Sequence, residues 1–390
     1  MSITLPATTA RRVALAGSTL LLAGGLVACG AGEKDRGASG DTSTDQVAAA
    51  AARAEQATAE VDDFPEVAPV DGADALAGKT VWYVPLGTAA PILKAMGDGT
   101  SAALAHLDVD VHICDGKFVP TEVAKCLEQA STAGADAVVT SFVDYGLIPA
   151  AYDALVDKGI PVLLAGAVPS PDRPADAALA YDDTSVDHAK GVERTADAVI
   201  ADSKGKANIL FLGVTDSPAL LKTADHAEKY YADECPGCTV TRIDTNTASL
   251  SKLASQVSAE LIKNPDIDYI VGEIDESGAP AIAGIQSAGR DGKVKLASTN
   301  GNLDALQRIK ADDTQIADTG LSPAFWGWRF ADGIVRMMTG GEPSTTGAVV
   351  RLFTADNVGD LNLTPGGYAT NEWYGDDGYQ DLFLTAWGAR

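Results

Sequence analysis

The stretch Gly134-Ala135-Asp136-Ala137-Val138-Val139-Thr140-Ser141 and the later segment Lys158-Gly159-Ile160-Pro161-Val162 decide the fold. Each contains a run of apolar residues, which is typical of a strand buried on both faces of a parallel sheet. The chain between the two runs is long enough for a helix. A strand, a helix and a second strand in this order predict a βαβ unit.

The same alternation of apolar runs and helical patterns continues along most of the chain. Helical spacing separates the runs, as in Leu253, Val257 and Leu261. At least eight such units are too many for one ordinary sheet and suit two sheets of four or five strands. We therefore predict an α/β protein with two doubly wound parallel sheets, and a (β/α)8 barrel is the alternative. The predicted strands are 80–86, 109–114, 135–141, 161–166, 207–213, 239–244, 268–273, 293–299 and 315–320.

The chain is strongly acidic. It contains 54 acidic and 29 basic residues, which give a formal net charge of −25. This charge opposes binding to nucleic acid and to anionic lipid, because both are themselves negative. At 390 residues the chain exceeds what one core usually holds, so we expect two domains.

The first apolar segment resembles a bacterial lipoprotein signal. Arg11 and Arg12 precede the apolar stretch 13–25, and Leu26-Val27-Ala28-Cys29-Gly30 closes it. The stretch is too short to span a bilayer, which takes about 20 apolar residues. The resemblance implies that residues 1–28 are removed and that Cys29 receives a lipid. We expect a protein anchored on the extracytoplasmic face of the cell membrane; an ordinary signal peptide with a chance cysteine is the alternative.

A polar segment follows this cysteine. Residues 30–77 are rich in Ala, Gly, Thr, Ser, Asp and Glu and contain almost no large apolar residues. Such a composition is not expected to bury a core. We predict that residues 29–77 form a flexible tether with a transient helix around 47–59.

The other four cysteines form two close pairs, Cys114 with Cys126 and Cys235 with Cys238. Disulfides at both pairs suit an oxidising compartment, and the first would stabilise the fold by roughly 3 kcal/mol on the chain-entropy model. A redox motif is the alternative for the second pair. Thioredoxin-like sites, however, place the first cysteine at a helix start after a strand, whereas this pair follows a helical segment. A structural disulfide is therefore the favoured interpretation.

The sequence holds no pattern for a cofactor, a metal or a catalytic triad. The loop 84–89 has neither the dinucleotide fingerprint nor a P-loop, so we expect no cofactor. The acidic pairs 182–183 and 312–313 are typical of solvated turns. We expect neither a metal site nor enzymatic activity. The four histidines, which are scattered without ligand spacing, are His106, His112, His188 and His226.

Further motifs lie in a fixed order between about residues 78 and 345. They are Thr80-Val81-Trp82-Tyr83-Val84 with Pro91 opening the next helix, the two segments quoted first, Tyr181-Asp182-Asp183, Gly272-Glu273-Ile274-Asp275-Glu276-Ser277-Gly278, and Ala331-Asp332 with Thr339-Gly340-Gly341-Glu342-Pro343. Together they resemble the type I periplasmic binding proteins, the ribose-binding-protein-like group that serves ABC importers.

The resemblance implies the periplasmic binding protein-like I fold, in which three crossover segments join two Rossmann-like lobes with parallel sheets. It implies a first lobe of residues 78–181 and 297–321 and a second lobe of residues 182–296 and 322–355. Residues 356–390, with Trp373 and Trp387, are expected to pack on the lobes as a tail. The implied function is capture of a small solute between the lobes of a monomer, whose closed form is recognised by an ABC permease in the membrane.

The resemblance also places the ligand contacts, at the carboxyl ends of the strands. The expected contacts are Leu86, Ala90, Ile92, Leu93, Phe142, Asp144, Gly166 and Ala167 in the first lobe, and Lys222, Thr245, Asp275, Asn300 and Leu321 in the second lobe and crossovers. Gly166-Ala167 replaces the Asp-Arg pair that ribose and galactose binders usually have. Because sugar hydroxyls need paired hydrogen bonds, we consider a sugar or polyol and a smaller, less polar solute.

Each polar candidate also has a structural interpretation. Lys222 lies on a charged helix, where lysines are commonly solvated. Asp275 and Asn300 follow strands and precede helical segments, so either could be a helix cap. The aromatic cluster Phe325, Trp326 and Trp328 is more typical of core or hinge packing than of a ligand platform.

Net charge and the expected export signal help to distinguish other functional classes. A sugar-responsive repressor with these lobes would need a basic helix-turn-helix domain, whereas this chain is acidic and begins with an export signal. A ligand-sensing partner of a membrane signalling protein is the alternative that the sequence does not separate from transport. An extracellular enzyme would be recognised by turnover of the bound compound.

Overall fold

The computed structural model describes residues 40–311, 314–343 and 347–389. The expected signal peptide and the Cys29 lipidation site lie outside the described residues. Within these ranges no helix is long and apolar enough to cross a membrane, and no group of His, Cys, Asp and Glu side chains could hold a metal ion.

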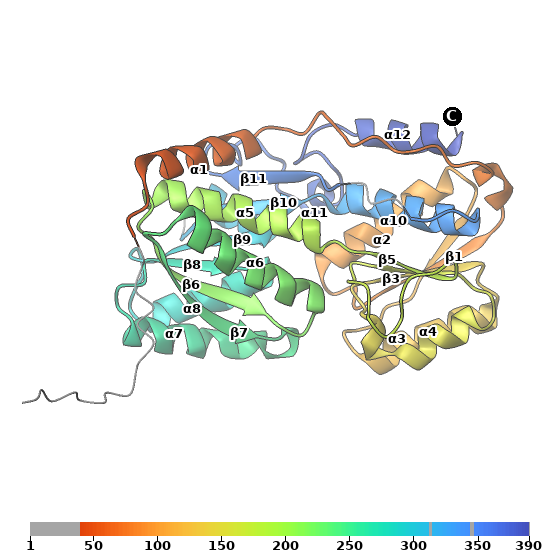
Figure 1. Ribbon diagram of the computed structural model, residues 1–390, viewed down its shortest axis with the longest axis horizontal. Coiled ribbons are helices and arrows are strands. Elements are labelled where there is room, and N and C mark those ends of the chain that lie inside the picture. Colours follow the sequence, from red (N-terminus) through yellow and green to blue (C-terminus); the bar gives the residue numbers. More distant parts are fainter. Residues whose placement is uncertain (1–39, 312–313, 344–346, 390) are drawn as a thin grey trace, which may run out of the picture. The chain divides into compact units, whose positions relative to one another are not determined.

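The first lobe is built on a parallel sheet of five strands in the order β2-β1-β3-β4-β5. Helices α2 and α10 cover one face, and α3 and α4 cover the other (Figure 1). In β1, β3 and β4, burial on both faces explains the apolar runs. The elements are β1 (Thr80–Pro85), α2 (Pro91–Ala105), β2 (Asp110–Ile113), α3 (Pro120–Ala133), β3 (Ala137–Ser141), α4 (Pro149–Val156), β4 (Val162–Ala165), β5 (Leu179–Asp182) and α10 (Pro323–Met338).

The second lobe contains six strands in the order β11-β10-β9-β8-β6-β7, of which only β11 is antiparallel. Helices α5 and α6 cover one face, and α7 and α8 cover the other (Figure 1). The two separate sheets exclude the barrel alternative. The elements are α5 (Ser185–Asp202), β6 (Asn208–Val214), α6 (Pro218–Glu234), β7 (Thr239–Thr245), α7 (Leu253–Lys263), β8 (Tyr269–Gly272), α8 (Gly278–Ser287), β9 (Lys295–Asn300), α9 (Leu303–Lys310), β10 (Gln315–Leu321) and β11 (Val350–Thr354).

The expected lobe boundaries are wrong in two segments. Residues 297–321 were assigned to the first lobe, but β9 and β10 extend the second sheet beside β8. Residues 322–338 were assigned to the second lobe, but α10 packs on α2, β3 and β4. Apolar periodicity identifies a strand or a helix but does not specify the sheet it joins, because that depends on hydrogen-bonding partners distant in sequence.

Both expected cysteine pairs are bonded. Cys114 and Cys126 join the end of β2 to α3, and Cys235 and Cys238 close the turn between α6 and β7. Cys235 follows the last residue of α6 and does not begin a helix. This position agrees with a structural disulfide rather than a redox motif.

The described part of the expected tether, residues 40–77, is folded. Helix α1 (Thr44–Ala57) lies along α5 with Ala50 and Ala54 buried, and Ser43 caps its first turn together with Gln46 (Figure 1). Alanine side chains allow two helices to approach closely without large apolar residues. The composition of this segment therefore gave no sign of its packing.

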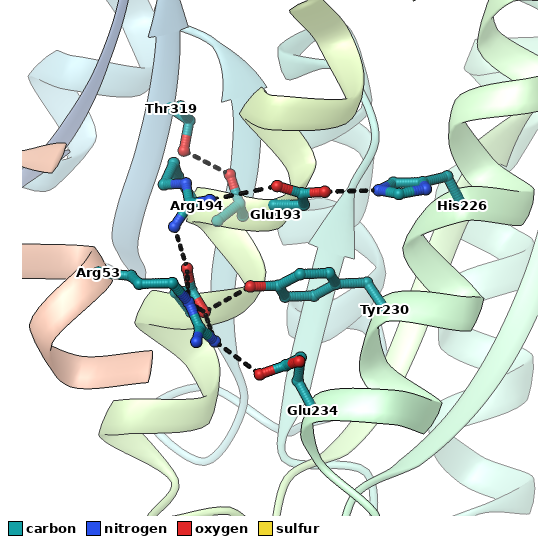
Figure 2. Close-up of polar contacts among 9 residues, drawn as sticks. Arg53, Glu193, Arg194, His226, Tyr230, Glu234 and Thr319 are labelled. Atoms are coloured by element: carbon teal, nitrogen blue, oxygen red, sulfur yellow. Dashed lines mark hydrogen bonds and ion pairs between the residues drawn. The ribbon is translucent and has the colours of Figure 1, made fainter. Parts of the chain in front are cut away.

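An ion pair between the partly exposed Arg53 and the buried Asp197 fastens α1 to the second lobe (Figure 2). The Arg53 guanidinium donates from Nη2 to Asp197 Oδ1 (2.7 Å) and to Glu234 Oε2 (2.9 Å). Asp197 also accepts from Tyr230 Oη (2.9 Å) and from Arg194 Nη1 (2.7 Å), and its side chain is fully buried. One carboxylate thus connects α1, α5 and α6.

We expect Arg53→Met to lower the free energy of unfolding by about 1–3 kcal/mol, because hydrogen bonds to charged groups contribute about that much. Asp197 keeps its bonds from Arg194 and Tyr230, so the lobe itself should remain folded. Urea unfolding gives the stability, and limited proteolysis should show faster cleavage within 44–60. The exposed Lys206→Met is the control, and equal behaviour of the two variants would contradict the role of Arg53.

The chain then passes from α1 to the first lobe beside the C-terminal tail. Val61 forms a bridge with Gly375, and Val70 N donates to Ala386 O (2.7 Å). The tail contains α11 (Pro365–Tyr368) and α12 (Gly378–Trp387), and α12 packs on α10. Trp387 stacks on Trp328 with ring centroids 5.8 Å apart.

Candidate ligand-binding cleft

The carboxyl ends of parallel strands are where ligands bind in open α/β sheets. In the first lobe Phe142 follows β3 and Gly166 follows β4. Both residues adopt positive φ angles, 58° and 73°, and a Cβ atom at Gly166 would lie 2.7 Å from the Phe142 ring. A side chain at Gly166 would therefore clash with the Phe142 ring, and the positive φ favours glycine at this position.

A second aromatic ring, missed by the sequence analysis, lies over the neighbouring loop. Phe118 has a φ of 57°, remains 41% exposed, and packs its ring against Gly87 after β1. Asp115 Oδ1 accepts from Thr88 N (2.9 Å) and from Lys117 N (2.9 Å), so it joins the two loops. A left-handed conformation at a bulky residue has no signal in the sequence.

Four of the expected contacts lie in the apolar core instead. They are Ile92, Leu93, Ala167 and Leu321. Pro91 begins α2, so Ile92 and Leu93 fall in its first turn and pack against the sheet. Leu86 and Ala90 are half-buried beside the same core.

Asp144 has a different environment. It is half-buried after β3, and its Oδ1 atom is buried without a hydrogen-bond partner among the described residues. Burial raises the pKa of Asp144 to about 6. A buried oxygen without a partner is costly, so this atom is suited to a donor from a ligand.

In the second lobe Asp275 belongs to a buried carboxyl pair. Ser298 Oγ lies 2.5 Å from Asp275 Oδ1 and 3.2 Å from Asp318 Oδ2. Asp275 Oδ2 also accepts from Asn302 N (2.6 Å), and Asp318 Oδ1 accepts from Gly301 N (3.0 Å). Burial and the neighbouring Asp318 raise the pKa of Asp275 above its usual range. The pair shapes the turn after β9.

Two buried side-chain oxygens at this edge lack hydrogen-bond partners among the described residues. Asn300 is the last residue of β9, and Glu273 directly follows β8. Neither Asn300 Oδ1 nor Glu273 Oε1 has a hydrogen-bond partner within the described part of the chain. Glu273 Oε2 accepts from Val214 N (2.7 Å), and burial raises the pKa of Glu273 to about 8. Glu273 lies in the 272–278 motif but was not among the expected contacts.

The helix-cap interpretation does not hold for Asp275 or Asn300. The residues that precede α8 and α9 are Ser277 and Asn302, and neither side chain makes a capping bond. Lys222 is exposed on α6 and donates to Ser185 Oγ (2.9 Å) at the first crossover. Thr245 ends β7 and is buried.

A cavity of about 590 Å³ opens beside the carboxyl pair. It lies between the first turns of α2, the 3-10 turn η4 (Asp275–Ser277), the start of α9 and the tail helix α11. Of the expected contacts it includes Asp275. Its lining residues are Pro91, Lys94, Ala95, Asp98, Asp275, Glu276, Asn302, Leu303, Asp304, Gln307, Pro365, Tyr368 and Ala369.

Arg329 connects the crossovers between the lobes. Its guanidinium donates from Nε and Nη2 to both oxygens of Asp182 (2.9 and 2.6 Å) and from Nη1 to Asp187 Oδ2 (2.5 Å). Asp187 Oδ1 accepts from Ala348 N (3.1 Å) in the third crossover. The three charged side chains are almost fully buried. The sequence signal that could have identified Arg329 as a site residue is its position within the mostly apolar α10.

An aromatic row lies beside this hinge. Trp326 on α10 stacks between Phe142 (6.1 Å between centroids) and His188 (5.7 Å), which belongs to α5. Burial lowers the pKa of His188 to about 4, so the ring is neutral. Trp326 is fully buried, in agreement with hinge packing, although its Nε1 atom lacks a partner among the described residues.

A comparison with protein families identifies the fold. The sequence model of the periplasmic binding protein domain matches residues 81–342. The chain belongs to this family. Helix α1 and the residues after 342 lie outside the matched region.

Solved structures share the architecture of this periplasmic binding protein at low identity. An ABC transporter solute-binding protein of Agrobacterium vitis, bound to α-D-tagatopyranose, is 19% identical, with a TM-score of 0.62 over 73% of this chain and 97% of that one. A 5-methylthioribose transporter solute-binding protein of Thermotoga lettingae is 16% identical, with a TM-score of 0.64 over 84% and 100%. These similarities concern the fold.

One curated relative is similar in sequence. A protein of Rhizobium meliloti that has been assigned a rhizopine-binding role is 21% identical over 215 residues, which are 54% of this chain and 68% of that protein.

Proposed function

We propose that this chain is a lipid-anchored, extracytoplasmic substrate-binding protein of an ABC transporter. It holds a small solute between its lobes and presents the closed form to a membrane permease. The observation that carries the proposal is the set of buried, unpartnered oxygens at the carboxyl edges of both sheets, on Asp144, Glu273 and Asn300. A solute that forms hydrogen bonds with these atoms would stabilise the closed state.

The ligands of the similar structures support a polar solute. The Agrobacterium vitis protein holds tagatopyranose, and the Thermotoga lettingae protein holds 5-methylthioribose. A third solute-binding protein, from Bacillus halodurans, holds myo-inositol. We propose a sugar, a polyol or a less polar small molecule for this chain. The proposed contacts are Leu86, Ala90, Phe142, Asp144, Gly166, Lys222, Thr245, Asp275 and Asn300.

The proposed anchor is Cys29, and α1 shortens the linker behind it. Helix α1 begins at Thr44, 15 residues after Cys29, and is fastened to the second lobe. Fifteen residues span at most about 50 Å. The second lobe would thus stay close to the membrane and to the permease. Radiolabelled palmitate should enter the wild-type protein but not Cys29→Ala; export of an unlabelled wild-type protein would contradict the anchor.

Ligand binding is tested by a thermal-shift screen against sugars, polyols and small apolar metabolites. A solute at about 100 times its dissociation constant should stabilise the fold by about 2.7 kcal/mol.

We expect Asn300→Ala to weaken binding of the solute at least tenfold without unfolding the protein, because it removes a buried acceptor. Unchanged affinity in this variant would contradict the assignment of Asn300.

A further inference from the structure

Two segments that lie outside the matched residues 81–342 pass side by side from the second lobe to the first. They are the chain after α1 and the C-terminal tail (Figure 1). Val61 N donates to Tyr374 O (2.7 Å), and Val61 pairs with Gly375 in an isolated bridge. Farther along, Val70 N donates to Ala386 O (2.7 Å). We call residues 58–70 and 368–387 together the strap.

One end of the strap is bonded to the second lobe. Arg351 on β11 donates from Nε to Thr58 O (2.9 Å) and from Nη1 to Trp373 O (2.7 Å). Tyr374 packs edge-on against Phe353, which also lies on β11, with 5.6 Å between the ring centroids. Arg351 and both of these rings are buried. The contacts that hold this end to the second sheet are therefore shielded from water.

The other end of the strap packs on α10 of the first lobe. Trp387 stacks on Trp328, and its Nε1 atom donates to Asp332 Oδ1 (2.9 Å). Phe64 stacks on Phe325 with 6.4 Å between the ring centroids. The buried apolar side chains at both ends belong to one cluster, which contains residues of β1, α9, α10, β11 and the tail. The strap thus joins the two lobes through a shared core.

Between its two ends the strap is short. Residues 62–63 separate Val61 from Phe64, and residues 376–377 separate Gly375 from α12. All four of these intervening residues are exposed aspartates. The three steps of chain from the Cα atom of Val61 to that of Phe64 span at most about 11 Å. The lobes can therefore separate further at this edge only if one end of the strap detaches.

We propose that the strap restricts how far the two lobes open about their crossovers. The three crossovers link β5 to α5, β10 to α10, and α10 to β11, and the strap adds two further connections between the same lobes. Opening must move all five connections together, so a wide-open state costs more free energy with the strap than without it. The inference goes beyond the proposed function and holds for any solute, because a restricted opening lowers the free-energy cost of closing.

Pulsed electron spin resonance between two spin labels tests the strap in the solute-free protein. Labels at Ala154→Cys on α4 and Ala283→Cys on α8, two exposed sites in a Cys29→Ala background, report the distance between the lobes. Four glycine and serine residues are inserted between residues 62 and 63 and again between 377 and 378, which leaves the contacts of both ends in place. Four added residues lengthen each crossing by up to about 13 Å, so the distance distribution should gain a component longer by about 5 Å or more. An unchanged distribution would overturn the proposal.

Further variants separate the strap from a general loosening of the fold. The same four residues inserted between Asp291 and Gly292, in an exposed turn of the second lobe, should leave the distance distribution unchanged. Trp387→Ala, which removes the stack on Trp328, should produce the longer component without any insertion. Leu261→Ala removes a buried side chain from α7 within the second lobe and should not produce it, although circular dichroism should show all variants folded. A longer component of equal size in either control would overturn the proposal.

Discussion

Replacing Arg329 by methionine is expected to lower the free energy of unfolding by about 3–5 kcal/mol, the effect of removing one partner from a buried ion pair. The change leaves two buried carboxylates, Asp182 and Asp187, without their cation. The guanidinium also joins α10 to the end of β5 and to α5. The substitution therefore removes hydrogen bonds that connect these elements between the lobes. Chemical unfolding followed by circular dichroism measures the effect.

A triple variant separates the charge from the packing. Arg329→Met combined with Asp182→Asn and Asp187→Asn removes the unpaired charges together with the cation. We expect it to be more stable than Arg329→Met alone, because a buried ion pair replaced as a whole often costs little. A single variant within 1 kcal/mol of the wild type, or a triple variant no more stable than the single one, would contradict the ion-pair account.

The contribution of Glu273 to the free energy of unfolding is expected to fall as pH rises from about 5 to 8. Burial raises the pKa of Glu273 from 4.5 to about 8 in the folded protein. Between these values the folded state holds a proton that the unfolded state has lost. The contribution of one such group falls by up to about 1.4 kcal/mol per pH unit and levels off above pH 8.

Glu273→Gln removes this titration and keeps an acceptor for Val214 N. Relative to the wild type, the variant should gain up to about 4 kcal/mol between pH 5 and pH 8, as one proton over three pH units predicts. Urea unfolding at each pH measures the difference, and Glu128→Gln serves as the control. A difference between wild type and Glu273→Gln that stays constant with pH would show that Glu273 does not titrate in this range.

Strands such as β1, β3, β4, β6 and β8 could be predicted from the sequence because each is a mostly apolar run. The run 80–86 became β1 and the run 135–141 contains β3, with boundaries within two residues. The short strands β5 and β11 were not predicted. β11 consists of five residues at the edge of its sheet, where pairing with β10 rather than composition defines the strand.

From the sequence, the candidate site could be predicted only to lie at the carboxyl ends of the strands. Asp275 and Asn300 were expected after strands, and the structure places them there with buried side chains. Which oxygens remain free depends on partners brought by distant segments, such as Tyr368 for Asn302 and Val214 for Glu273. No local pattern records such pairings.

The sequence by itself determined the α/β class and the two bonded cysteine pairs, because both depend on residues that are near one another in the chain. Only the tertiary structure decided the lobe of β9, β10 and α10, the docking of α1 through Arg53, and the hinge at Arg329. Each depends on a partner more than 100 residues away or on the choice between two similar apolar surfaces. Hydrogen-bond pairing between distant segments and the burial of charged side chains determine where each of these segments packs.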